Sequence, residues 1–376
     1  MDREQQIMSF IRRNPFVSQQ ELADAIGISR SAVAGYVAAL TRKGSIRGRA
    51  YVLAEEGSVL CIGGANLDSK ARGKQPLRLG ASNPVAVAES CGGVARNIAV
   101  NLAALSANVS LLTAVGDDKA GRWLLDRTSS QGVDIGPSLV LGGEKTGSYT
   151  AILDEDGEMF IAFADMEIYE RITPETLEEK WPHIAASKLV VADANLPACS
   201  LAWLARRCGD VGLPLFVDPI SPEKAKKLPD RLDGIAAVFP NLAEARQLAG
   251  EGGDELPTAE GEAEWAALAR RILDRGAGHV LITLGKHGAY CAGADGGVHL
   301  PALPVKVVDV TGAGDAFLAG VAYGVLRGES FADACRAGLA AARIALETAS
   351  SSSEHLNEER LAHAIREAQL HLPQSN

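Results

Sequence analysis

Aromatic residues and long apolar runs are scarce in this 376-residue chain. Aromatic residues make up 5% of it, so an apolar core must be built chiefly from Ala, Val, Leu and Ile. No uninterrupted apolar run of about 18 residues occurs, and the sequence therefore predicts no membrane span. The first six residues, Met1 to Gln6, lack the basic and then apolar order of a signal peptide, so we expect a cytoplasmic protein without a membrane partner.

Cysteines at metal-ligand spacing are absent as well. The six cysteines are scattered along the chain, and we expect them to be buried free thiols in a reducing cytoplasm. They are Cys61, Cys91, Cys199, Cys208, Cys291 and Cys335. Hydrophobic residues make up 47% of the chain, with 39 glycines and 16 prolines, which is typical of a globular α/β protein and not of a disordered one.

The N-terminus has a net positive charge, whereas the rest of the chain has a net negative charge. The chain carries a formal net charge of −10, whereas residues 1–53 contain eight basic and four acidic side chains. This local charge of +4 leaves −14 for the remainder of the chain. Such an asymmetry predicts two modules with different partners.

Residues 1–55 are predicted to form helices followed by a short basic hairpin. A capping box begins at Ser18, Gly27 separates two helical patterns, and the hairpin carries Arg47 and Arg49. This order resembles a winged helix-turn-helix DNA-binding domain, which implies a helix in the major groove and arginines on phosphates. A docking or dimerisation module with a solvated basic face is the alternative. Because the local charge is modest, we expect a DNA-binding form to be a homodimer.

Residues 56–372 alternate between apolar strands and helical patterns. This alternation predicts a mostly parallel sheet covered by helices on both faces, a three-layer αβα sandwich. Two alternating strands, Gly147–Leu153 and Glu158–Ala164, flank a hairpin signal and interrupt the pattern. We therefore predict a small β lid from about residues 69–90 and 147–165.

The stretch Asp309–Phe317 is the most informative part of this module. The apolar run Pro304–Val310 predicts a buried strand before it, and a helical pattern follows over residues 316–328. N–H groups at a helix start suit a phosphate or an oxyanion, so residues 312–314 are candidates to hold one. At this helix start, Asp315 is either a capping residue or a base that accepts a hydroxyl proton.

Polar side chains follow several other predicted strands. Asn66 and Asp68 come after the strand that ends in Gly63-Gly64, and they are either partners of sugar hydroxyls or an Asx turn. Because parallel strands end at one edge of a sheet, further polar groups after strands are expected to converge there. These groups are Asp193, Asn195, Asp218, Asn241, Glu244 and Thr283, the last followed by a glycine turn without P-loop spacing.

Together these motifs resemble the ribokinase-like (PfkB) carbohydrate and nucleoside kinases over about residues 57–370. They are Gly63-Gly64 with Asn66 and Asp68, Gly92-Gly93 with Asn97, Asn241-x-x-Glu244, Thr283-x-Gly285-x-x-Gly288 and Asp309-Val310-Thr311-Gly312-Ala313-Gly314-Asp315. The resemblance implies a ribokinase-like fold and an ATP- and Mg²⁺-dependent phosphotransferase.

The resemblance also implies roles for individual residues. Asp315 would take the proton from the substrate hydroxyl, and the N–H groups of Gly312, Ala313 and Gly314 would form an anion hole. The substrate would be held by Asn66, Asp68, Gly92, Gly93, Arg96, Asn97 and Met166. The nucleotide would be held by Asn241, Thr283, Gly285 and Gly288. Glu244 would act on Mg²⁺ through water, and Asp309 with Thr311 would hold a monovalent cation such as K⁺.

Within the family, three stretches are most similar to pseudouridine kinases: Ser82-Asn83-Pro84, residues 92–99 and residues 148–166. The bulky Arg96 disfavours free ribose. We therefore predict phosphorylation of the 5′-hydroxyl of a nucleoside, pseudouridine first, with inosine, ribose or fructose as alternative acceptors. A transcription regulator that uses the kinase-like domain as a ligand sensor is an alternative of another class. The intact Asp315 and Glu244 favour retained chemistry, since a pure sensor needs no base.

Overall fold

The computed structural model describes residues 3–13, 17–47, 58–250, 261–348 and 355–371. Its N-terminal helices α1 (Arg3–Arg13), α2 (Gln19–Ile26) and α3 (Arg30–Arg42) pack around a small apolar core. Ser18 and Glu21 form the predicted capping box, and Gly27, at φ +71°, ends α2 in the left-handed conformation that favours glycine. The predicted hairpin beyond Arg47, with Arg49, lies outside the described residues.

An eight-stranded sheet forms the centre of the second module. Its strand order is β14-β13-β12-β11-β10-β9-β1-β4. The neighbouring strands among β12, β11, β10, β9, β1 and β4 are parallel. The strands β13 and β14 are antiparallel to their neighbours and form one edge of the sheet. The strands are β1 (Val59–Ile62), β4 (Val109–Leu112), β9 (Leu189–Asp193), β10 (Leu215–Asp218), β11 (Ala237–Val238), β12 (His279–Thr283), β13 (Ala289–Gly293) and β14 (Gly296–Leu300).

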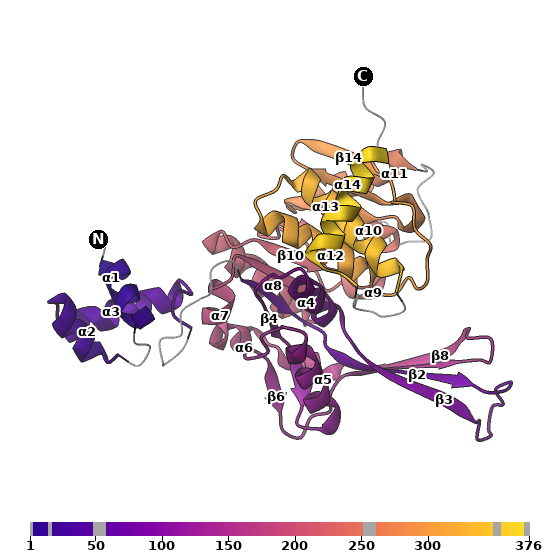
Figure 1. Ribbon diagram of the computed structural model, residues 1–376, viewed down its shortest axis with the longest axis horizontal. Coiled ribbons are helices and arrows are strands. Elements are labelled where there is room, and N and C mark those ends of the chain that lie inside the picture. Colours follow the sequence, from indigo (N-terminus) through magenta and orange to yellow (C-terminus); the bar gives the residue numbers. More distant parts are fainter. Residues whose placement is uncertain (1–2, 14–16, 48–57, 251–260, 349–354, 372–376) are drawn as a thin grey trace.

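Helices cover both faces of this sheet and bury two separate apolar clusters. Along β1, Leu60 and Ile62 point into one cluster, and Val59 and Cys61 point into the other. The first cluster is covered by α6 (Pro174–Glu179), α7 (Trp181–Ala185), α8 (Ala198–Val211), α10 (Leu242–Leu248) and α11 (Glu262–Asp274). The second is covered by α4 (Val94–Ala104), α5 (Lys119–Ser130), α12 (Ala313–Leu326) and α13 (Phe331–Leu346), and α14 (Glu358–His371) packs on α13. The predicted three-layer αβα sandwich is therefore confirmed (Figure 1).

A four-stranded sheet projects from this body, as Figure 1 shows. Its order is β3-β2-β7-β8, with β2 (Asn66–Gly73), β3 (Val85–Gly92), β7 (Ser148–Leu153) and β8 (Met159–Asp165). The strands β7 and β8 confirm the predicted hairpin. The strand β2 begins just after Gly63-Gly64, and β3 ends at Gly92. This sheet is therefore connected directly to the edge of the main sheet where the polar residues lie.

The shorter elements complete the chain. They are β5 (Ala114–Gly116), β6 (Leu139–Leu141), α9 (Pro222–Ala225) and the 3-10 helices η1 (Glu167–Arg171) and η2 (Gly285–His287). The sequence predicts one strand over 109–115, but the chain leaves the main sheet at Thr113 because β5 pairs with β6 instead. Among the described residues, no helix combines the length and the apolar character that a membrane span requires.

Two further predictions are wrong. The run Pro304–Val310 forms no strand, and Val310 is 71% exposed. The preceding strand β14 already closes the sheet edge, so this segment crosses the surface and its apolar side chains line a cavity rather than the core. The six cysteines are free thiols as predicted, but Cys199, in the first turn of α8, is exposed.

Candidate active site

The start of α12 carries the glycine turn that precedes Asp315. Gly312, at φ +80°, adopts the left-handed conformation, and its carbonyl accepts the first helical hydrogen bond from Ala316 N–H at 2.9 Å. Glycine is not required in the same way at Gly314, because a Cβ there would meet open space. The turn therefore leaves the backbone around Gly314 open for approach by another molecule.

Asp315 lies in the first turn of α12 and faces α4. Its Oδ2 accepts a hydrogen bond of 2.9 Å from Asn97 Nδ2. Burial raises the pKa of Asp315 to about 7, and the charges of Asp193 and Asp68 act in the same direction, against the Asn97 hydrogen bond. A carboxylate with such a pKa can accept a proton near neutral pH, and its amide partner orients it.

Asp193, at the end of β9, lies where the Gly63-Gly64 and Gly92-Gly93 loops approach each other closely, and this close approach requires glycine. Its buried carboxylate accepts hydrogen bonds from the N–H groups of Gly64 at 2.8 Å, Ala95 at 2.8 Å and Asn195 at 2.9 Å. A Cβ on Gly63 would overlap this carboxylate, and a Cβ on Gly93, at φ +100°, would overlap the Gly64 carbonyl. Asp193 thus joins three loops at the sheet edge. Sequence reasoning noted its position after a strand but not this function.

The predicted sugar-binding residues Asn66 and Asp68 lie together at the base of the lid. Asn66 Nδ2 donates to Asp68 Oδ1 at 2.5 Å, and a Cβ on Gly92 would overlap the Asp68 carboxylate. Burial raises the pKa of Asp68. The side chain of Arg96 is buried, and it donates to Asn97 Oδ1 at 3.2 Å and to Gln131 Oε1. The structure therefore brings the predicted residues from β2, β3 and α4 to one place.

A cavity of about 790 Å³, the lid cavity, opens between the lid and α5. Asp68, Arg96, Asp309 and Thr311 line it. The other predicted residues Asn66, Gly92, Gly93, Asn97 and Asp315 are not among its lining residues, but Asn66 contacts Asp68 and Asn97 contacts Arg96. Met166 does not line it either and packs against the first apolar cluster. One face of α5 and its C-cap supplies further lining residues that sequence reasoning missed: Trp123, Arg127 and Gln131. Their spacing of four residues places them in one stripe along a helix, which was the available signal.

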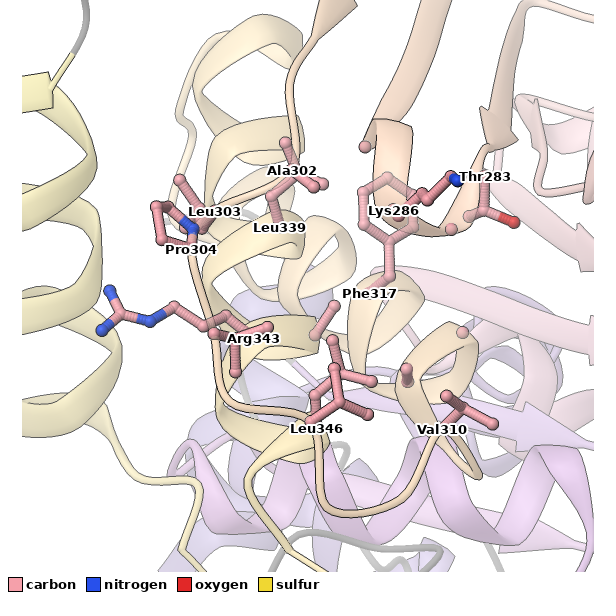
Figure 2. Close-up of a pocket in the computed structure, with 17 residues that line it drawn as sticks. Thr283, Lys286, Ala302, Leu303, Pro304, Val310, Phe317, Leu339, Arg343 and Leu346 are labelled. Atoms are coloured by element: carbon pink, nitrogen blue, oxygen red, sulfur yellow. The ribbon is translucent and has the colours of Figure 1, made fainter.

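A second cavity of about 570 Å³, the apolar cavity, lies on the other side of the Gly312 turn (Figure 2). Leu303, Pro304, Phe317, Leu339 and Leu346 line its apolar walls, and Thr283, Gly285, Lys286 and Gly288 lie at one end. Figure 2 shows that Arg343 extends away from the cavity, and its Nη1 donates to Glu367 at 2.8 Å. Ala313 and Gly314 line this cavity, so the start of α12 separates the two cavities.

Asn241 and Glu244 form a capping box at the start of α10. The Glu244 side chain accepts from the Asn241 backbone N–H at 2.9 Å and from its Nδ2 at 2.6 Å. Glu244 is only 2% exposed, and burial raises its pKa. Burial also raises the pKa of Asp218 well above its usual value, and the charges of Asp315 and Glu244 add to this effect. Sequence reasoning noted Asp218 after its strand but did not include it in the site.

This concentration of carboxylates favours a divalent cation, since a nearby positive charge stabilises the ionised forms. In the described part of the chain, no group of three acidic, His or Cys side chains could coordinate a metal directly. Asp218 and Glu244 offer carboxylate oxygens, which are the ligands that Mg²⁺ prefers, and Mg²⁺ usually keeps several of its waters.

Asp309 and Thr311 form a tight local turn before Gly312. Asp309 Oδ1 accepts from Thr311 N at 2.9 Å and from Thr311 Oγ1 at 2.8 Å. The backbone hydrogen bond is the main reason that the pKa of Asp309 is lowered, so this carboxylate stays ionised at neutral pH. The turn offers oxygen atoms beside the lid cavity, which suits the predicted cation loop.

Comparison with known proteins gives matches in both modules. The model of the pfkB family of carbohydrate kinases matches residues 57–358, and a winged helix-turn-helix DNA-binding model matches residues 2–47. From Escherichia coli K12, the uncharacterized sugar kinase YeiI is 34% identical over 95% of this chain and 96% of its own length. The pseudouridine kinase of the same organism is 38% identical over 75% of this chain and 88% of its own length.

A solved structure supports the architecture. A carbohydrate kinase from Agrobacterium tumefaciens superposes with a TM-score of 0.71 at 30% identity, covering 82% of this chain and 97% of that chain. The match with YeiI extends over both modules, because 95% of this chain cannot be covered without residues of the first one.

Proposed function

Since the chain belongs to the pfkB family of carbohydrate kinases, we propose that it transfers the γ-phosphoryl group of ATP to the 5′-hydroxyl of a nucleoside, with pseudouridine as the acceptor. The family match confirms the predicted phosphotransferase and its ribokinase-like fold. One observation carries the proposal: Asp315, with a pKa raised to about 7, is oriented by Asn97 at the turn that separates the two cavities.

In this proposal, the acceptor nucleoside lies in the lid cavity. Asn66, Asp68 and Asn97 bind its ribose hydroxyls, and Asp315 accepts the proton of the 5′-hydroxyl as the oxygen attacks phosphorus. The N–H groups of Gly312, Ala313 and Gly314 stabilise the charge on the transferred group. Phosphoryl transfer depends mainly on in-line positioning and charge neutralisation, and a turn between two cavities provides the first.

ATP is the proposed occupant of the apolar cavity. The apolar walls suit a nucleobase, whereas Thr283, Lys286 and the glycine turn suit polar groups of the nucleotide. Mg²⁺ supplies charge neutralisation when it is bound, and Glu244 with Asn241 would hold its water ligands. The turn of Asp309 and Thr311 is the proposed site of a monovalent cation such as K⁺.

The lining of the lid cavity favours a nucleoside over a free sugar. Trp123, which is 41% exposed, lines the cavity together with Arg127 and Gln131 on the same side of α5. Bases stack on aromatic side chains, and arginine and glutamine hydrogen-bond to base edges. The relative named pseudouridine kinase supports pseudouridine among the nucleosides. Inosine, ribose and fructose are the competing acceptors.

We expect Trp123→Ala to raise the KM for pseudouridine about tenfold, because a stacking surface for the base is lost. The KM for ribose should stay unchanged, since ribose has no base. The measurement is ATP consumption with pseudouridine, inosine, ribose and fructose, with Arg122→Ala as the control on the same helix. An equal loss for ribose and pseudouridine would show that Trp123 does not recognise the base.

We expect Glu244→Gln to raise the Mg²⁺ concentration needed for half-maximal activity about tenfold. Glutamine can keep the capping box, so the substitution removes the negative charge while preserving the start of α10. The measurement is a Mg²⁺ titration of activity, with the exposed Glu223→Gln as the control. An unchanged titration would count against a role of Glu244 at the metal.

We also propose that the first module binds DNA as a homodimer, in a cytoplasmic protein. The residues at the start of α3, Ser29, Arg30 and Ser31, are exposed and suit contact with base edges. This activity would make the chain a regulator that is also a kinase. It differs from a pure ligand sensor, which needs neither a base such as Asp315 nor a metal-site carboxylate such as Glu244.

A further inference from the structure

Arg47, one of the two arginines predicted to contact DNA phosphates, contacts the second module instead. Its Nη2 donates to Asp134 Oδ2 at 3.3 Å and lies 3.2 Å from Nδ1 of His183. Only 13% of the Arg47 side chain is exposed. A DNA phosphate therefore cannot pair fully with this guanidinium while the contact persists.

Both partners of Arg47 are anchored in the second module. Asp134 Oδ2 also accepts from Ser110 Oγ at 3.0 Å, and Asp134 Oδ1 accepts from Gly136 N–H at 2.9 Å. His183 belongs to α7, and burial together with the charge of Arg47 lowers its pKa. A neutral imidazole can accept a hydrogen bond at Nδ1, so His183 is suited to receive the Arg47 donor.

The backbone of the first module joins this contact. Gly44, at φ +74°, lies directly on the peptide between Ala185 and Ala186, where a Cβ would overlap the chain. Arg42 and Lys43, at the end of α3, line a cavity of about 580 Å³ against residues of the second module. Gly44, directly after α3, is therefore buried against the second module, whereas Ser29, Arg30 and Ser31 at the start of α3 are exposed.

We propose that the contact of Arg47 with Asp134 and His183, here named the Arg47 latch, competes with DNA for the same guanidinium. The inference rests on the proposed DNA binding of the first module. Arginine contacts to phosphates supply sequence-independent affinity for DNA, and an arginine held by a carboxylate must be released before it contributes. The latch thus lowers the DNA affinity of the full chain, and the kinase domain sets that affinity.

The latch is weak enough to be released. Arg47 is mostly buried, but 52% of the Asp134 side chain is accessible, so water screens this ion pair from the Asp134 side and weakens it. Arg47 Nε is buried and has no hydrogen-bond partner among the described residues, so the guanidinium is only partly satisfied where it lies. Phosphate oxygens could satisfy it more completely.

The test compares full-length variants for binding to a labelled random-sequence DNA duplex by fluorescence anisotropy. The latch variant, Asp134→Asn with His183→Ala, should bind about three- to tenfold more tightly than the wild type. The matched control, Asp126→Asn with His363→Ala, makes the same charge change at exposed positions and should not show this gain. In the latch variant, adding Arg47→Ala should reduce the slope of log affinity against log salt by about one.

A double-mutant cycle separates competition from a general electrostatic effect. With Arg47→Ala already present, the latch substitutions should change DNA affinity no more than the control does. A latch variant that binds like the control would overturn the proposal, and so would a gain that persists without Arg47. Absence of DNA binding by every variant at low salt would also overturn it. ATP consumption by the same preparations reports the proposed kinase function separately.

Discussion

Asp315→Asn is expected to lower kcat about 10³-fold while leaving ATP binding nearly unchanged. The amide is the same size and can keep the contact with Asn97, but it cannot accept the proton of the attacking hydroxyl. The apolar cavity that is proposed for ATP is lined by Ala313 and Gly314 and not by Asp315. Steady-state kinetics and nucleotide titration, with wild type as reference, check both parts. A variant with near-normal kcat would show that Asp315 is not the base.

The raised pKa of Asp315 makes the same substitution informative about stability. Between about pH 4 and pH 7 the folded protein holds this proton and the unfolded chain does not, so stability falls as pH rises through this window. Asparagine cannot ionise, so Asp315→Asn should have a higher Tm than the wild type at pH 8. For the wild type, kcat/KM should increase with pH through about 7. Loss of activity together with a lower Tm would indicate misfolding instead of loss of the base.

Asp193→Ala is expected to destabilise the protein by about 3 kcal/mol or more and to abolish activity. The substitution leaves three N–H groups without their acceptor at the sheet edge, those of Gly64, Ala95 and Asn195, and each buried unsatisfied group costs about 1–3 kcal/mol. The same N–H groups belong to the loops that hold Asn66 and Asn97, so the substrate site would lose its alignment.

The control for this change is Asp210→Ala, at an exposed position of α8. Urea denaturation should show little change for the control and a clearly lower midpoint for Asp193→Ala. Asp193→Asn should be intermediate, because the amide oxygen can accept some of the hydrogen bonds but its NH₂ group opposes others. If Asp193→Ala were as stable as the control, the three loops would have to be held by other contacts.

Contiguous motifs were predicted well because their function is encoded in neighbouring residues. The turn of Gly312 before Asp315, the capping box at Ser18 and the hairpin between β7 and β8 all depend on local backbone chemistry. The apolar run Pro304–Val310 was wrongly predicted to form a buried strand, and the error has a physical reason. Burial in the sheet and burial in a cavity wall favour the same side chains, so composition cannot distinguish them.

Trp123 and Met166 show two ways in which the prediction of site residues from the sequence failed: Trp123 lines the lid cavity but was missed, and Met166 was predicted but does not line it. The stripe that contains Trp123 had a helical spacing, but nothing in the sequence said which way that face of α5 points. Met166 lies at the end of the stretch 148–166 that resembles pseudouridine kinases. In the structure it packs against the first apolar cluster and does not line the lid cavity. Both outcomes depend on how distant segments are packed together, and side-chain periodicity does not report that.

By itself, the sequence determined the two modules, the layered fold, the phosphotransferase family and the strand ends that carry its polar groups. The modules, the layers and the strand ends follow because strand periodicity, glycine turns and helix caps act over a few residues, whereas the family followed from the resemblance of the motifs to a known family. Only the tertiary structure decided that Asp193 joins three loops, that α5 lines the lid cavity and that Arg47 contacts Asp134 and His183. These contacts join residues up to 136 positions apart in the chain, and such pairings are set by the packing of whole layers.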